Sequence, residues 1–297
     1  MEELISEHLA TWTEAQIVKP AGGRGRKSSG ERNRYGIKKL RELILELAVR
    51  GKLVAQDPED EPASVLLERI AAEKASLIQA GKIKKQKGLP PISEEEKPFA
   101  LPEGWESVRF GDLLLRALTG LDKGKSFQNV DFEYLYFKMN NILNEGGFSL
   151  IDITRVDATP YELQKYSLKD GDFLFNTRNS RELVGKTCVV RGIDKENVIY
   201  NNNILRVEFL HIFPEFIDCW FRSLSGKLLL EEKKSNTTNV CAIYQGKLFK
   251  MLCIIPPVEE QQRIVAKVDE LMALCDRLEK QQTDSAATQQ TLLATLL

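Results

Sequence analysis

The sequence has little histidine, no long apolar run and almost no net charge. Its two histidines, His8 and His211, are far apart, so a metal site built on histidine is poorly supplied. No run of about 18 apolar residues occurs, so we expect no membrane-spanning helix. The formal net charge is −1, which excludes an overall electrostatic signature of nucleic-acid binding. An anionic partner would have to bind to local basic patches on the surface.

Paired cysteine motifs and a basic N-terminal region are also absent. The five cysteines, at positions 188, 219, 241, 253 and 275, include no C-x-x-C pair, and their number is odd. Reduced thiols in a cytosolic protein are the simplest interpretation. The first residues include Glu2, Glu3 and Glu7, which argues against a signal peptide, so we expect a cytoplasmic protein.

The hydrophobic patterning predicts an α+β protein in three regions. Residues 1–98 are predicted to be helical, 99–255 to form one mixed α/β domain, and 256–297 to form a long helix. The first region is expected to hold a short helix at 1–18, a flexible basic arm at 19–36, helices at 37–49 and between Pro62 and Gly81, and a charged linker at 82–98. The arm contains six basic residues and one acidic residue, Glu31, so it has an excess of five positive charges.

The middle region alternates short β-branched or aromatic runs with turn residues. Strands are predicted at 173–175, 187–191, 204–209 and 251–255. Pro214 is suited to start a helix that bears Phe216, Trp220 and Leu224.

The last region begins where Pro256 and Pro257 stop a strand. Its apolar positions, Ile264, Val268, Leu271, Cys275 and Leu278, step by four, three, four and three residues. This heptad spacing predicts a coiled-coil seam. The partner is expected to be either residues 37–50 of the same chain or the same helix of a second copy, which would give a homodimer.

Two segments resemble phosphate-binding loops but miss their glycine pattern. Ser180–Thr187 has serine in place of the first glycine, and Gly120–Ser126 is one residue short. We therefore interpret Lys186 and Lys125 as lysines on exposed turns. No Ser-His-Asp or Cys-His arrangement can be proposed with any specificity. We therefore predict a non-catalytic chain that neither hydrolyses ATP nor methylates or cuts DNA.

The richest polar segment is Asn176–Arg181, which follows the apolar run 173–175. Arginine can read guanine, and asparagine adenine, in the major groove, while lysine, serine and threonine suit phosphates. The alternative is a turn whose Asn and Ser side chains bond their own backbone. Two other polar loops, 122–129 and 233–239, add weight to the first interpretation. The candidate DNA-binding residues are Arg178, Asn179, Ser180, Arg181, Lys186, Lys123, Lys125, Asn129, Thr237, Thr238 and Asn239. The amide clusters 140–141 and 201–203 are as well explained by turns, and core packing is expected for Phe127 and Tyr244.

Together these residues resemble the specificity subunit of type I restriction–modification enzymes. The segments that carry the likeness are 36–54, Leu101–Trp105, Phe175–Thr187 and Pro256–Leu278, with Asp57-Pro58 and Glu61–Ser64 between them. The resemblance implies one target-recognition domain that reads half of a bipartite site in double-stranded DNA, followed by a spacer helix. It also implies partner methyltransferase subunits that use S-adenosylmethionine, and partner motor–nuclease subunits that use ATP and Mg. No cofactor is then expected in this chain.

Such subunits usually carry two recognition domains, each followed by a spacer helix, whereas this chain has one of each. It is expected to be either a half-length subunit that dimerises or the N-terminal half of a longer protein. The competing hypothesis is a coiled-coil scaffold protein whose middle domain binds protein. That hypothesis explains the terminal helix equally well but the Arg/Asn/Lys loops less well.

Overall fold

The computed structural model describes residues 35–193, 197–236 and 240–296. The predicted helix at 1–18, the six basic residues of the predicted arm and the candidates Thr237, Thr238 and Asn239 lie outside the described residues. Contacts divide the chain into two compact units, one formed by residues 57–262 and the other by residues up to 56 together with those from 263 onward. Among the described helices, none is both long and apolar enough to cross a membrane.

The larger unit is built on a four-stranded antiparallel sheet with strand order β2-β9-β5-β7. Its strands are β2 (Leu114–Thr119), β9 (Ile204–Phe209), β5 (Phe173–Asn176) and β7 (Thr187–Val189). β9 has the predicted bounds, β5 runs one residue longer than predicted, and β7 ends two residues earlier. All four residues of β5 are buried, which explains why it reads as an apolar run rather than as an alternating pattern.

The two faces of β5 contribute to two parts of the core. On one face, Phe173 and Phe175 lie 5.8 Å and 5.4 Å, centroid to centroid, from the ring of Phe221 on α8 (Pro214–Arg222). On the other face, Leu174 joins a cluster that includes Tyr200. Because both faces are filled, β5 is held rigidly at the point where it leaves the sheet.

Three smaller sheets complete this unit. One has the order β4-β3-β8, with β4 (Thr154–Val156) antiparallel and β8 (Val198–Tyr200) parallel to β3 (Tyr134–Phe137). Another pairs β1 (Glu106–Arg109) with β12 (Leu252–Ile255). The last has the order β10-β11-β6, from Ser235–Asn236, Cys241–Ala242 and Arg178–Asn179.

The helices of this unit differ from the predictions in two places. α5 (Ala63–Gln79) begins after Pro62, which is therefore its N-cap and not its first residue. α8 ends at Arg222, and the Ser223 hydroxyl accepts a hydrogen bond from Gly226 N–H to start α9 (Leu224–Glu231). The prediction that this helix extends to Leu224 is wrong, because the serine cap starts a new helix there; Leu224 is the first residue of α9 and is 57% exposed. The shorter helices are α6 (Phe110–Leu113), α7 (Pro160–Tyr166), α10 (Gln245–Leu248), η1 (Glu94–Glu96) and η2 (Lys125–Phe127).

The predicted linker 82–98 is fastened to the unit by the buried Arg109. Its guanidinium donates to both carboxylate oxygens of Glu96 at 2.7 Å, and to the carbonyls of Pro90, Pro91 and Lys250. Four of these five hydrogen bonds hold the linker in a defined path, which propensity alone would not give to a proline-rich segment, and the fifth joins it to Lys250.

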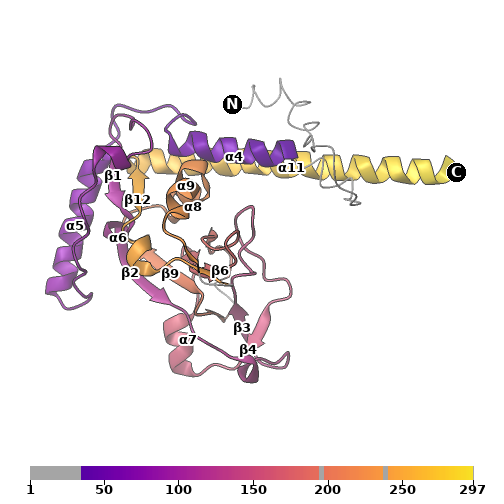
Figure 1. The fold of residues 1–297 in the computed structure, drawn as a ribbon, viewed down its shortest axis with the longest axis horizontal. Coiled ribbons are helices and arrows are strands. Elements are labelled where there is room, and N and C mark those ends of the chain that lie inside the picture. Colours follow the sequence, from indigo (N-terminus) through magenta and orange to yellow (C-terminus); the bar gives the residue numbers. More distant parts are fainter. Residues whose placement is uncertain (1–34, 194–196, 237–239, 297) are drawn as a thin grey trace. The chain divides into compact units, whose positions relative to one another are not determined.

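The smaller unit contains α4 (Tyr35–Val49) and α11 (Val258–Leu296) from Arg263 onward, and the two helices lie alongside each other (Figure 1). The five heptad positions of α11 from Ile264 to Leu278 are at most 7% exposed. Arg41 of α4 donates to Asp276 at 2.6 Å and to Glu279 at 3.2 Å. Buried residues continue C-terminally along α4 to Val49 and N-terminally along α11 to Ile264, so the helices run antiparallel. Of the two predicted partners for the seam, the structure therefore shows α4 of the same chain.

Candidate nucleic-acid interface

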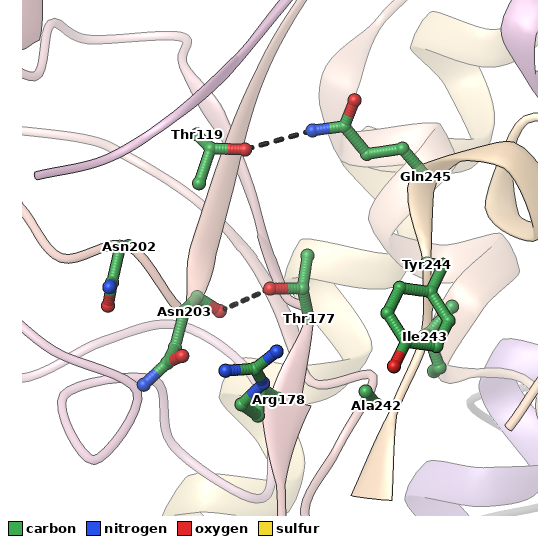
Figure 2. A pocket seen from close by; sticks show the side chains of 9 residues that line it. All are labelled: Thr119, Thr177, Arg178, Asn202, Asn203, Ala242, Ile243, Tyr244 and Gln245. Carbon is green, nitrogen blue, oxygen red and sulfur yellow. Dashed lines mark hydrogen bonds between the residues drawn. The ribbon is translucent and has the colours of Figure 1, made fainter. Parts of the chain in front are cut away.

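A surface cleft of about 500 Å³ lies in the larger unit at the ends of several strands (Figure 2). It is lined by Thr119, Thr177, Arg178, Asn202, Asn203, Ala242, Ile243, Tyr244 and Gln245. These residues come from four segments that are distant in sequence, and seven of the nine are polar or aromatic with a polar tip. Most of the lining can therefore donate or accept hydrogen bonds.

One side of the cleft is positioned by the continuation of β5. Asn176, the last residue of β5, is fully buried. Its side-chain oxygen accepts the Arg178 N–H at 3.2 Å, and its amide nitrogen donates to the Leu183 carbonyl at 3.1 Å. Asn176 therefore has the local turn role, and it fixes the backbone from which the Arg178 side chain projects.

The opposite side is formed where β2 ends and β9 begins. Thr177 N–H and its hydroxyl both donate to the Asn203 carbonyl, at 2.8 Å and 2.9 Å (Figure 2). After Thr119 the chain crosses closely over Tyr200 and Asn201, and a Cβ at Gly120 would lie 2.3 Å from the Tyr200 carbonyl oxygen. Only glycine allows this approach, which places Thr119 beside the Asn201–Asn203 turn.

The small sheet β10-β11-β6 brings two of the predicted polar loops together. β11 pairs with β6 through Ala242–Arg178 and Cys241–Asn179, and with β10 through Asn236–Cys241. The chain segment between β10 and β11 contains the three candidates at 237–239, which lie outside the described residues. The described pairing nevertheless shows that loops 177–181 and 233–239 originate in the same sheet.

Arg178 is the candidate best placed for recognition. It is exposed, it lines the cleft, and its guanidinium has no hydrogen-bond or ion-pair partner among the described residues. Figure 2 draws the Arg178 side chain between those of Asn203 and Tyr244 in the view shown. An arginine held on a fixed backbone with five unused N–H donors is able to bind a planar acceptor pair or a phosphate.

Arg181, only three residues further on, is engaged within the protein. Its guanidinium forms an ion pair with Glu231, and Lys234 donates to the same carboxylate at 2.7 Å and to the Arg181 carbonyl at 2.7 Å. The hydrogen bond from Lys234 is the largest cause that lowers the pKa of Glu231, and Arg181 adds to it. The Arg181–Glu231–Lys234 cluster thus ties the 177–186 segment to the end of α9.

Asn179 and Ser180 lie between the two arginines and outside the cleft lining. The Asn179 side-chain oxygen accepts the Ser180 N–H at 2.9 Å. The Ser180 carbonyl accepts N–H groups of Leu183 and Val184, which forms a turn. Asn179 and Ser180 are therefore bonded as turn residues, which agrees with the alternative interpretation of this segment as a turn.

Lys186 is not on an exposed turn, so that part of the prediction is wrong. The residue is half-buried, its ammonium donates to the Ile142 carbonyl, and burial lowers its pKa. Thr187 is the first residue of β7, and its hydroxyl donates to the buried Asp218 at 2.6 Å. In a phosphate-binding loop the Gly-Lys-Thr sequence opens a helix, whereas here it enters a strand, so the segment lacks the geometry of that motif.

In the loop 122–129 the candidates have different surroundings. Lys123 pairs with Glu162 at 2.8 Å, and its side chain is 10% exposed. Lys125 is exposed on η2. The Asn129 side-chain oxygen accepts the Asp131 N–H at 3.2 Å, as in an Asx-turn. The structure does not place these three in the lining of the cleft.

Core packing was predicted for Phe127 and Tyr244, and it is wrong for both. The two side chains are 51% and 53% exposed. Tyr244 lies two residues beyond the end of β11 and forms a wall of the cleft. The ammonium of Lys123 lies 5.4 Å from the Phe127 ring centroid. An exposed aromatic ring next to polar groups is available for contact with a ligand.

Sequence reasoning missed Thr119 and Gln245, which meet across the cleft by a 2.9 Å hydrogen bond (Figure 2). Neither residue lies in a motif, and only the strand order brings the two together. For Asn202 and Asn203 the sequence left a turn role and a DNA contact equally open, and both residues line the cleft. Among the described residues, no group of three or more His, Cys, Asp or Glu could hold a metal ion.

Comparison with known proteins identifies a family that this chain matches. Residues 102–287 match the family described as "Type I restriction modification DNA specificity domain". Over its whole length the chain is 38% identical to the type I restriction enzyme EcoAI specificity subunit and 36% identical to the EcoEI specificity subunit, both from Escherichia coli. It covers 49% of each, so the chain spans about half the length of these curated relatives.

A solved structure supports the fold. The chain is similar, with a TM-score of 0.50 and 18% identity, to a chain described under "Structural basis underlying complex assembly and conformational transition of the type I R-M system". The likeness covers 98% of this chain and 66% of the other. It confirms the predicted α+β architecture.

Proposed function

This chain belongs to the family of type I restriction modification DNA specificity domains, and from that premise we propose that it recognises one half of a bipartite site in double-stranded DNA. The observation that carries the proposal is the cleft, where amide side chains, an exposed tyrosine and the Arg178 guanidinium, which has no partner among the described residues, project from fixed backbone. These are the groups that read base edges in the grooves of DNA.

The proposed contacts fall into two groups. Arg178, Asn202, Asn203, Tyr244 and Gln245 face the base pairs, and the sequence adds Thr237, Thr238 and Asn239 as further candidates. Lys125 is exposed and suits a phosphate. Arg181, Lys123 and Lys186 are bound to other parts of the protein, so they act by holding the loops in place.

We further propose that the chain itself is not an enzyme but works with partner subunits. Methyltransferase subunits would supply adenine methylation with S-adenosylmethionine, and motor–nuclease subunits would supply ATP- and Mg-dependent translocation and cleavage. The two relatives in E. coli are specificity subunits of restriction enzymes, which supports this division of labour. On its own, the purified chain should neither hydrolyse ATP nor methylate or cut DNA.

The packing of α11 against α4 gives less support to the alternative of a coiled-coil scaffold protein than to DNA recognition. The apolar stripe of α11 from Ile264 to Leu278 is already buried against α4, so these positions do not require a second chain. An interaction through the rest of α11 would be additional to this intramolecular packing.

The test is retention of the chain on duplex DNA over a range of salt concentrations. Each neutralised phosphate releases counterions, so the logarithm of affinity should fall linearly with the logarithm of salt, by roughly 0.9 per phosphate contact. Single-stranded DNA of the same length and a duplex of unrelated sequence serve as comparisons. Equal retention at low and high salt, or no retention, would contradict DNA recognition and favour the scaffold alternative.

A further inference from the structure

We propose that the cleft reads base edges rather than the DNA backbone, and that Arg178 specifies a guanine within the half-site. This inference deepens the proposed function and rests on it. It assigns a defined role to one side chain of a cleft whose lining is known in detail.

The charge of the lining separates the two ways in which an arginine binds DNA. Phosphate sites usually gather several cations or backbone N–H groups around the anion. In this cleft, Arg178 is the one charged side chain among the described lining residues. The remaining polar groups are threonine hydroxyls, a tyrosine hydroxyl and three amides.

Amides both donate and accept hydrogen bonds, and phosphate oxygens only accept them. Asn202, Asn203 and Gln245 therefore offer acceptors for which a phosphate has no counterpart, whereas base edges present donors and acceptors side by side. The composition of the cleft thus fits bases better than phosphates. The edge of guanine in the major groove presents two acceptors, N7 and O6, which match the fork of a guanidinium.

The setting of Arg178 also suits discrimination. Its backbone is fixed by the buried Asn176 and by pairing with Ala242, while its guanidinium has no bonding partner within the part of the chain that the structure describes. A fixed starting point lowers the conformational entropy that is lost on forming two simultaneous hydrogen bonds. The exposed ring of Tyr244 provides a wall against which the base or the guanidinium can pack.

The same segment contains a matched control. Arg181 has the same chemistry three residues away, but its guanidinium is committed to Glu231. Removing Arg181 should loosen the segment and lower affinity for all sequences alike. Removing Arg178 should lower affinity only for sequences that carry the specified guanine.

The experiment is selection of bound DNA from a randomised duplex pool by the 297-residue chain, alone and with a methyltransferase subunit, followed by sequencing. The variants are Arg178→Ala, Arg178→Lys and Arg181→Ala. The wild type should prefer guanine at one position. Arg178→Ala should lose that preference and bind the preferred site roughly 5- to 150-fold more weakly. Arg178→Lys should keep the salt dependence but weaken the guanine preference, because the ammonium lacks the rigid planar fork that aligns two N–H donors with N7 and O6.

Each other outcome has a defined meaning. An even loss of affinity over all sequences in Arg178→Ala, with the salt slope reduced by about one, would identify a phosphate contact and overturn the inference while leaving the proposed function intact. Unchanged binding in Arg178→Ala would also overturn it. If the wild type shows no sequence preference, both the inference about Arg178 and the proposed function are contradicted. Far-UV circular dichroism of each variant checks that the fold is intact. Removal of the exposed Arg178 side chain is not expected to change the fold.

Discussion

Replacing Leu271 by alanine tests the intramolecular seam between α4 and α11. Leu271 is fully buried, whereas Leu274, one turn of chain later on the same helix, is only half-buried. The two substitutions remove the same atoms from the same helix. They therefore differ mainly in what the lost side chain contacted, which makes Leu274→Ala the matched control.

The expected magnitudes follow from burial. A Leu→Ala change at a fully buried site costs about 2–5 kcal/mol, because transfer free energy is lost and a cavity remains. At the half-buried Leu274 the loss should be about 1 kcal/mol, since less area is removed from water on folding. Hydrogen exchange measured by mass spectrometry is the suitable assay, because it reports on α4 separately from the larger unit.

In Leu271→Ala, amide exchange over residues 35–49 should accelerate by roughly 30-fold or more, since 1.4 kcal/mol corresponds to a factor of ten. Exchange over β5 and β9 should be unchanged, because these strands belong to the other unit. Equal acceleration in Leu271→Ala and Leu274→Ala, or none over α4, would refute an intramolecular seam.

Two predictions concern pH. The hydrogen bonds from Arg109 are the largest cause that lowers the pKa of Glu96 to about 2, so the stability they contribute should be present above about pH 4.5 and lost as pH falls toward 2. Arg109→Ala should remove this slope in urea unfolding and cost about 1–3 kcal/mol at pH 7, and an unchanged slope would contradict the assignment. Burial, the largest cause, raises the pKa of Asp172 to about 6, so the folded state should lose stability as pH rises from about 4 to 6. Asp172→Asn should flatten that fall; a variant with the wild-type pH profile would show that Asp172 is not its source.

Some elements could be predicted because their signals are local. β9 follows a run of three asparagines and has β-branched residues, and the heptad positions of α11 are visible over two turns and more. The residues of β5 form a short apolar run because both faces of the strand are covered. In these cases the spacing of apolar residues reports directly on burial.

Other features depended on contacts between distant segments. Arg178 and Arg181 are equivalent in sequence, and they differ because Glu231 reaches only one of them. Phe127 and Tyr244 were assigned to the core since their residue types favour burial, but type does not show whether a face is covered. The break between α8 and α9 had a local signal, the serine cap at 223, which the longer apolar pattern concealed.

The composite origin of the cleft has an evolutionary consequence. Its walls come from chain segments near 119, 177, 203 and 244, so a genetic crossover between 120 and 240 would combine walls that were selected for different ligands. Residues in contact have non-additive effects, and such hybrids should more often lose recognition than acquire a new one. Exchange of the entire stretch from β1 to β12 would transfer all four segments as a set. New specificities should therefore arise in this lineage mainly by inheritance of whole cassettes rather than by mosaic shuffling within one.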